Sequence, residues 1–395
     1  MIENWINIFK EEKQMKKSKK LMAALLSTVM VVSALTACGG GGAKTSSTKS
    51  AASTKSSATS TAKSSAATST PATTDGGTKH IDVIAKGFQH QFWKAVELGT
   101  KKAAEEFGVE VTFQGPDNES AIAQQVEYLN TAIAKQPTAI CLAALDTQAS
   151  IPSIQQAMEA NIPIIGFDSG VPNAPEGAIK ANASTNNAVA GALAAEELYK
   201  LIESKVKDAK DTVRIGVVAQ ESNSQSIVDR TKGFVDKMTE LCGADNVSVE
   251  GHDSLKNEKS GAKVVLDVGI PAEVKDVDAA AVASAILEKN DLIAIYGSNE
   301  FAANAIITAN EGLDKIGEGK VVAVGFDAGK KLLDAVRSKL FAGAVTQDPV
   351  QIGYQAVKLA VEAADGKSVA DVDTGAKWYN ADNMDADDIK PCLYE

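Results

Sequence analysis

The sequence predicts an α/β protein with two lobes, each built on a doubly wound parallel sheet. From position 79 onward, short apolar runs typical of strands alternate with segments whose apolar residues recur at the helical period. The alternation starts again near position 212, after a long helical segment at 186–205. About 315 of the 395 residues take part, which is enough for two domains.

Each half of this alternation predicts five strands with helices between them. The predicted strands of the first half are 81–85, 109–114, 138–145, 162–167 and 178–183, with helices at 95–107, 121–135, 148–160 and 186–205. Those of the second half are 212–220, 264–268, 292–296, 321–326 and 341–346, with helices at 226–241 and 279–289 and others between and after the later strands. Strands joined by helices pair in parallel, so each sheet is expected to be covered on both faces.

The stretch from Lys86 to Trp93 is the most distinctive turn in the chain. It joins the first strand to the first helix, so it lies at the carboxyl edge of a sheet, where open α/β sheets bind ligands. The turn contains the adjacent aromatics Phe92 and Trp93, although the whole chain has only 10 Phe, 6 Tyr and 3 Trp. Two interpretations stay open here: the pair faces a ligand, or it opens the helix and packs on the core.

Polar side chains recur where predicted strands end. Asp and Asn are also common helix caps and turn residues, so a single one at such a place indicates little. Their recurrence at one edge indicates a polar cleft. The residues concerned are Asp146, Asp168, Asn299, Asp327 and Gln347.

The first 78 residues have the composition of an export signal and a linker. Four lysines at positions 16–20 precede an uncharged, mostly apolar run at 21–37, and Cys38 follows small residues that resemble a bacterial lipobox. We therefore expect 1–37 to be a signal peptide, with Met15 a more ordinary start than Met1, and Cys38 to carry the lipid. An uncleaved membrane helix is the alternative. Positions 38–78, rich in Gly, Ser, Thr, Ala and Lys, are expected to form a disordered linker.

Composition argues against several other functions. The net charge of −11 disfavours nucleic acid as a partner. Phosphate-binding loops and the nucleophile elbow of hydrolases are missing from the sequence, and its three histidines lack metal-ligand spacing. The Asp cluster at 382–388 lacks the glycine and closing glutamate of a calcium loop, so a solvated acidic surface is expected. Cys141 is expected to be buried, whereas export permits a disulfide between Cys242 and Cys392. We expect no enzyme activity, no cofactor and no metal.

From position 79 to the end, the chain resembles periplasmic sugar-binding proteins of the ribose, arabinose and galactose type, the extracytoplasmic receptors of ABC importers. The motifs that carry the resemblance occur in the same order and with similar spacing. They are Lys86–Trp93, Ile164–Asp168, Asp229–Phe234, Tyr296–Glu300, Val324–Asp327 and Gln347–Gly353.

The resemblance implies the type I periplasmic binding fold, in which three crossing strands join two lobes that close over a monosaccharide. It assigns 79–184 plus 348–378 to the N-terminal lobe and 185–347 plus 379–395 to the C-terminal lobe. It also implies an aromatic pair against the sugar ring and a set of polar ligand positions. The implied ligand residues are Lys86, His90, Phe92, Trp93, Asp168, Arg230, Asn299, Asp327 and Gln347.

Two places depart from the ribose-type pattern. Ser169 stands where those proteins usually have Arg, which removes a fork of hydrogen-bond donors and puts ribose specificity in doubt; Lys86 or His90 is expected to compensate. The region from 252 to 278 is longer than in ribose proteins, and its ligand position is assigned to Asp267 only as a guess.

The implied function is capture of a pentose or hexose by a monomeric lipoprotein on the outer face of the cytoplasmic membrane, for delivery to an ABC permease. A sugar suits such a site because its C–H faces stack on aromatic rings and its hydroxyls both donate and accept hydrogen bonds. Alternatives left open are a ligand sensor for a histidine kinase or chemoreceptor, and a receptor for a polyol, inositol or furanosyl signal molecule. A repressor with the same fold is excluded by the export signal and the missing basic headpiece.

Overall fold

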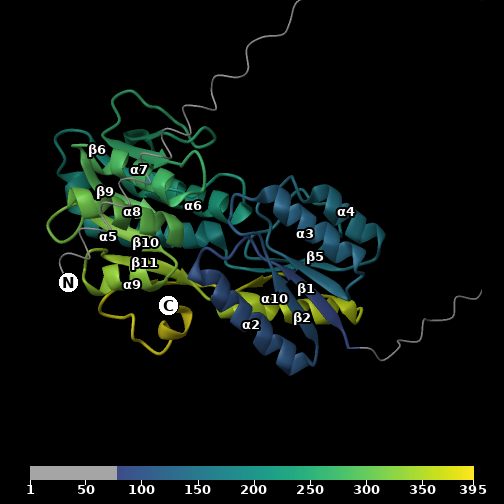
Figure 1. Cartoon of the computed structure of the whole chain (residues 1–395). Coiled ribbons are helices and arrows are strands. Elements are labelled where there is room, and N and C mark those ends of the chain that lie inside the picture. Colours follow the sequence, from purple (N-terminus) through teal and green to yellow (C-terminus); the bar gives the residue numbers. More distant parts are fainter. Residues whose placement is uncertain (1–77) are drawn as a thin grey trace, which may run out of the picture. The chain divides into compact units, whose positions relative to one another are not determined.

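The computed structural model of the chain describes residues 78–395 (Figure 1). The predicted signal peptide, Cys38 and almost all of the predicted linker lie outside these residues. Within 78–395, none of the helices combines the length and the apolar character that a bilayer crossing needs. The described strands form two sheets, one of six strands and one of seven.

The first sheet is parallel throughout and has the order β12-β5-β4-β3-β1-β2. Its strands are β1 (His80–Ile84), β2 (Glu110–Gln114), β3 (Ala139–Leu142), β4 (Ile164–Phe167), β5 (Ile179–Ser184) and β12 (Val372–Asp373). Successive side chains of β1 point to opposite faces of the sheet. Val83 packs with helices α2 (Gln91–Phe107) and α10 (Pro349–Ala364), whereas Ile84 packs with α3 (Ile122–Ala134) and α4 (Ile151–Glu159). We call this sheet and its four helices the first lobe.

The second sheet has the order β13-β11-β10-β9-β6-β8-β7, and only β13 runs antiparallel to its neighbour. Its strands are β6 (Val213–Val218), β7 (Val247–Glu250), β8 (Val264–Gly269), β9 (Leu292–Gly297), β10 (Val322–Phe326), β11 (Gly343–Gln347) and β13 (Ala376–Tyr379). One face is covered by α5 (Asn187–Lys207) and α6 (Gln225–Cys242), and the other by α7 (Asp276–Leu287), α8 (Glu300–Leu313) and α9 (Lys330–Arg337). We call this sheet and its helices the second lobe.

The chain passes between the sheets three times. The crossings follow β5, β11 and β12, at 184–187, 347–349 and 373–376. The predicted class of two α/β sheets with three connections is therefore what the structure has. Three strands lack a counterpart in the sequence prediction, namely β7, β12 and β13. They are two to four residues long, too short to show a period of their own.

Two glycines bring α5 and α6 into close contact. A Cβ atom at Gly191 would lie 2.1 Å from the carbonyl oxygen of Arg230, and one at Gly233 would lie 2.1 Å from that of Ala188. Backbone therefore meets backbone at this helix pair, and no larger residue fits. The contact also sets the position of Arg230, one of the predicted ligand residues, relative to Asn187 at the start of α5.

Candidate ligand-binding site

A small cavity lies where the carboxyl ends of strands from both sheets meet. All nine predicted ligand residues line it. Lys86 follows β1 and Asp168 follows β4, in the first lobe, whereas Asn299 and Asp327 follow β9 and β10 in the second. Four further residues line the cavity that were not predicted from the sequence. They are Glu119, Ser226, Ile227 and Glu300.

The aromatic pair at the start of α2 lines the cavity and packs on the core at the same time. Phe92 and Trp93 are 6% and 1% exposed and belong to the apolar cluster between α2, α10 and the first sheet. Their rings meet edge to face, with centroids 5.0 Å apart and an interplanar angle of 88°. The pair therefore packs on the core and also presents a surface to the cavity, whereas its contact with a ligand stays a prediction.

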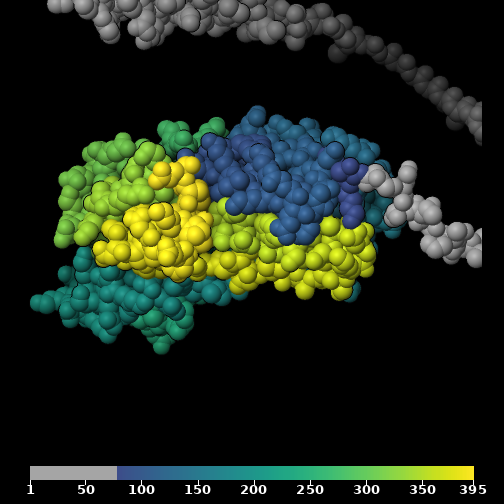
Figure 2. All heavy atoms as spheres, turned by 90° about the horizontal axis from the view of Figure 1, so that it is seen from below, coloured from purple at the N-terminus to yellow at the C-terminus, as the bar shows by residue number. Residues whose placement is uncertain are grey.

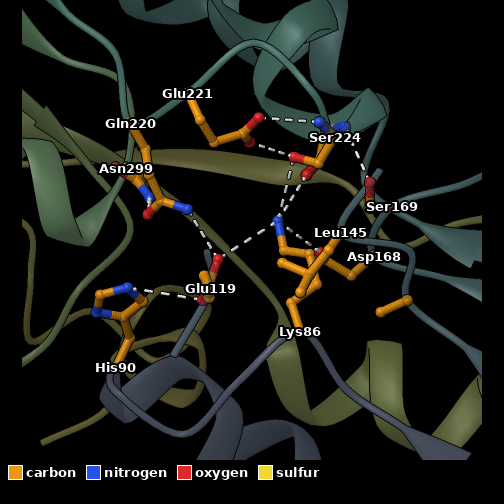
Figure 3. A network of polar contacts seen from close by, with 12 residues as sticks. Lys86, His90, Glu119, Leu145, Asp168, Ser169, Gln220, Glu221, Ser224 and Asn299 are labelled. Carbon is orange, nitrogen blue, oxygen red and sulfur yellow. Dashed lines mark hydrogen bonds and ion pairs between the residues drawn. The ribbon is translucent and has the colours of Figure 1, made fainter. Parts of the chain in front are cut away.

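Lys86 is the centre of a polar network that spans both lobes (Figure 3). It is 4% exposed, its Nζ lies 3.7 Å from carboxylate oxygens of Glu119 and Asp168, and it donates to the hydroxyls of Ser224 and Ser226 on the second lobe. Burial opposes the charge, but the two carboxylates outweigh it and raise the pKa of the Lys86 ammonium group. Lys86 therefore stays a hydrogen-bond donor at neutral pH.

Glu119 joins the two lobes from a loop between β2 and α3. Its carboxylate accepts hydrogen bonds from Trp93 Nε1 at 2.7 Å and from Gln220 Nε2, in the second lobe, at 2.8 Å, and it lies 3.6 Å from His90 Nε2. Burial favours the neutral acid, but Lys86 and His90 prevail and lower the pKa of Glu119. Glu119 does not directly follow a strand, which is why the strand-end pattern did not identify it.

Arg230 is held by contacts within its own lobe. Its guanidinium lies 3.7 Å from the centroid of the Phe326 ring and donates twice to Asn187 Oδ1, at 2.6 and 3.1 Å, and once to the carbonyl of Ser298 at 3.0 Å. Nη1 is also 3.9 Å from Asp327 Oδ2. A planar fork fixed in this way presents its remaining donors to the cavity in one orientation.

Asp168 and Asp327 occupy equivalent places in the two lobes, each directly after a strand. Both have left-handed backbone conformations, with φ of 54° and 74°, which non-glycine residues seldom adopt. Asp327 accepts hydrogen bonds from Gln347 Nε2 at 2.7 Å and from the backbone N–H of Glu300 at 3.1 Å. Burial raises the pKa of Asp168 against the opposing effects of Lys86 and Arg230. Strained backbone that aims a carboxylate into a cavity is typical of binding sites.

Three polar atoms on residues that line the cavity are buried without a hydrogen-bond partner in the described structure. They are Asp168 Oδ2, His90 Nε2 and Gln347 Oε1. Buried polar groups are nearly always paired, because an unpaired one costs about 1–3 kcal/mol. The cavity is therefore suited to a ligand whose own donors and acceptors satisfy these atoms.

Other expectations turned out differently. The assignment of Asp267 to the ligand site was wrong: this residue lies within β8 and pairs with Arg214 at 3.1 Å. Asp146 caps a turn by accepting from the backbone N–H groups of Gln148 and Ala149. Ser169 is buried, and its hydroxyl accepts from the Ser226 N–H of the other lobe at 3.3 Å.

The disulfide that export would permit is not formed. Cys242 and Cys392 are both free thiols, as is the buried Cys141. Cys242 ends α6 and packs against the α5–α6 side of the second sheet, whereas Cys392 lies beside Thr346 at the end of β11. Among residues 78–395, no cluster of potential metal ligands occurs.

The fold agrees with the comparisons to known proteins. Residues 81–368 match the family model of the periplasmic binding protein domain, so the chain belongs to the periplasmic binding protein family. Solved structures related to it include a protein from Brachyspira murdochii titled as an ABC transporter and LacI family transcriptional regulator, which is 36% identical with a TM-score of 0.67 and aligns over 80% of this chain and 99% of its own. The predicted family and α/β fold are confirmed.

Several relatives have sugars in their names or titles. An ABC transporter solute-binding protein from Agrobacterium vitis with bound D-fucose is 27% identical, has a TM-score of 0.69 and aligns over 80% of this chain and all of its own. The D-allose-binding periplasmic protein of Escherichia coli K12 is 22% identical over 309 residues, which cover 76% of this chain and 90% of that protein.

Proposed function

We propose that the protein is the extracytoplasmic solute-binding lipoprotein of an ABC transporter, and that it captures a pentose or hexose in the cavity between its lobes. The observation that carries the proposal is the cavity itself, which combines two fixed aromatic rings with buried, unpaired hydrogen-bonding atoms. A monosaccharide supplies the complementary groups, namely C–H faces for the rings and hydroxyls that both donate and accept.

Each predicted ligand residue has a role in this proposal. Phe92 and Trp93 pack against the sugar ring. Asp168, Asp327 and Gln347 accept from hydroxyls, while Lys86, Arg230, Asn299 and His90 complete the set with donors. Hydrogen bonds to charged partners contribute roughly 1.5–3 kcal/mol each, and micromolar affinity needs about 8 kcal/mol net. Four or five such bonds therefore suffice even after the free-energy cost of closing the lobes is subtracted.

Closure of the lobes is the proposed mechanism. Hydrogen bonds already cross between the lobes around the cavity, from Lys86 to Ser226 and from Gln220 to Glu119. A sugar that contacts both lobes shifts the open–closed equilibrium towards the closed state by its preference for that state. The permease could then distinguish loaded from empty receptor. The lobe boundaries at 184/185, 347/348 and 378/379 belong to this proposal.

The remaining parts of the proposal follow from the sequence and the family. In this proposal, Cys38 carries the lipid anchor at the outer face of the cytoplasmic membrane, and the linker separates the lobes from that membrane. The receptor acts as a monomer and catalyses no reaction. Relatives titled as transporter components that bind D-fucose and D-arabinose, at 27% and 25% identity, support a monosaccharide ligand.

A thermal-shift screen of residues 79–395 tests the ligand. The panel contains D-ribose, D-allose, D-fucose, D-arabinose, D-glucose, D-galactose, D-fructose, myo-inositol and ribitol. A ligand at 100 times its dissociation constant stabilises the folded state by about 2.7 kcal/mol, so a true ligand shifts the melting temperature clearly. A shift with one monosaccharide supports the proposal, one with ribitol or inositol alone moves it to a polyol receptor, and none across the panel rejects a sugar ligand.

A further inference from the structure

The segment 390–395 contacts several of the elements that build the cavity. It starts with a 3₁₀ turn, Lys390–Cys392. The carbonyl of Cys392 accepts a hydrogen bond from the hydroxyl of Thr346 at 3.0 Å. Tyr394 is bonded twice to the loop after β10: its carbonyl accepts from the Gly329 N–H at 3.0 Å, and its phenolic oxygen accepts from the Ala328 N–H at 3.2 Å.

Two of the three residues contacted in this way adjoin a predicted ligand residue. Thr346 precedes Gln347, and Ala328 follows Asp327. Asp327 has a φ of 74°, a conformation that the surrounding structure must hold because the residue itself does not favour it. The Asp327 carbonyl accepts from the hydroxyl of Tyr379 at 2.9 Å, and the next two residues, Ala328 and Gly329, donate their backbone N–H groups to Tyr394. The segment therefore holds the backbone that aims this carboxylate.

The ring of Tyr394 also contacts the opposite lobe. It packs edge to face with Phe92, with centroids 6.2 Å apart and an interplanar angle of 69°. Tyr394 contacts the apolar clusters of both lobes, and Glu395 anchors the segment to the second lobe through Arg337 at 3.3 Å. In Figure 2 the yellow atoms of the chain's highest-numbered residues adjoin the blue atoms of the first lobe and the green atoms of the second.

We propose that Tyr394 is a positioning residue of the ligand site, which holds Asp327 from one lobe and Phe92 from the other in the geometry that binds ligand. Tyr394 is not among the residues that line the cavity, so it acts through these two and not by touching the ligand. The consequence of the proposal, the expected effect of Tyr394 on sugar affinity, rests on the proposed function. Its geometric part, the support that Tyr394 gives to the loop after Asp327, does not depend on any ligand and can be tested in the ligand-free protein.

Hydrogen exchange of the ligand-free protein tests the geometric part. Tyr394→Phe removes the phenolic acceptor of the Ala328 N–H but keeps the ring and the carbonyl that accepts from Gly329. Tyr354→Phe is the matched control, because it removes a hydroxyl that bonds Glu106 at 2.9 Å in the first lobe. We expect faster exchange at the Ala328 amide in Tyr394→Phe alone. Unchanged exchange at that amide would overturn the proposal.

Affinity tests the consequence, with D-fucose, D-arabinose and D-allose as calorimetric probes. Loss of one hydrogen bond in Tyr394→Phe should weaken binding about threefold, and loss of the ring in Tyr394→Ala at least about tenfold, with no change in Tyr354→Phe. Lower melting temperatures with unchanged affinity in both Tyr394 variants would reduce the residue to a structural role and overturn the proposal. Should the wild type bind none of the sugars in the thermal-shift panel, the proposed ligand class fails, while the exchange experiment still decides the positioning role.

Discussion

Glu300 accepts a hydrogen bond from the backbone N–H of Phe92, 3.4 Å from Glu300 Oε2. The bond crosses from α8 of the second lobe to the first turn of α2 in the first, so a carboxyl group of one lobe caps a helix of the other. The helix start favours a negative charge there, but burial and the nearby Asp327 oppose it more strongly and raise the pKa of Glu300 to about 8. Glu300 is therefore mainly protonated at neutral pH.

Stability of the protein should fall with rising pH because of this residue. The pKa of Glu300 in the folded chain, about 8, lies above its ordinary value of 4.5, so the folded state binds more protons between these values. The contribution is fully present below pH 4.5 and is lost as the pH rises to about 8. Glu300→Gln keeps the protonated shape without titrating. We therefore expect the melting temperature of the variant minus that of the wild type to increase by at least about 2 °C from pH 5 to pH 8.

Other titrating groups face Glu300, namely Asp327, Glu119, His90, Tyr379 and Tyr394, but they are present in both proteins and largely cancel in the comparison. The exposed Glu311→Gln on the same helix is the control and should give curves parallel to the wild type. Parallel curves for Glu300→Gln as well would show that Glu300 is ionised throughout.

The fold was predictable because its strands and helices carry strong local patterns. A run of mostly apolar residues predicts strand β1, a polar stretch predicts the turn after it, and apolar residues at the helical period predict α2. The same alternation recurs in the second lobe. The strands that could not be predicted are short. For example, β12 has only two residues, and it pairs with β5 because the chain crosses between the sheets nearby, which no local sequence pattern indicates.

The site was predictable where ligand residues sit at strand ends and unpredictable where they do not. Asp168 and Asp327 follow buried strands, so the sheet edge brings them together. Glu119 comes from a loop, and Glu300 stands next to a strand-end residue, at the first position of α8, where an acidic residue usually marks only a helix start. Contact between residues far apart in the chain, such as Glu300 with Phe92, depends on how the lobes meet, which single-residue patterns do not contain.

Gly233→Ala should destabilise the second lobe. Its Cβ would come within 2.1 Å of the Ala188 carbonyl on α5, and a backbone atom cannot move away as a side chain can. We expect a loss of about 2 kcal/mol or more in the free energy of unfolding, measured by urea denaturation. Gly312→Ala in α8 is the matched control: its Cβ has open space, so helix propensity alone should stabilise by about 0.5–1 kcal/mol. Equal effects of the two substitutions would refute the close helix contact.

The three thiols of residues 78–395 should react slowly in the native protein. Burial raises the pKa of Cys242 and of Cys392 to about 11, so at pH 8 only about one thiol in a thousand is ionised. Burial raises the pKa of the Cys141 thiol as well. Iodoacetamide should label few sites before denaturation and three afterwards, and a reductant should leave the melting temperature unchanged. Only one labelled site after denaturation without reductant would indicate a disulfide.

Alanine at Asp168, Arg230 or Asp327 should weaken sugar binding at least about tenfold each, because every substitution removes a charge-assisted hydrogen bond of roughly 1.5–3 kcal/mol. Calorimetry with the sugar that shifts the wild type most in the thermal screen gives the values. Asp236→Ala is the control, since this exposed carboxylate lies on the same helix as Arg230 and pairs only with Lys232 among the described residues. The Arg230 variant should also lose stability, because Asn187 Oδ1 and the Ser298 carbonyl lose their donor. Affinity unchanged in all three variants would place the ligand elsewhere, whereas loss in the two aspartate variants with full retention in Arg230→Ala would mean that Arg230 only supports the fold.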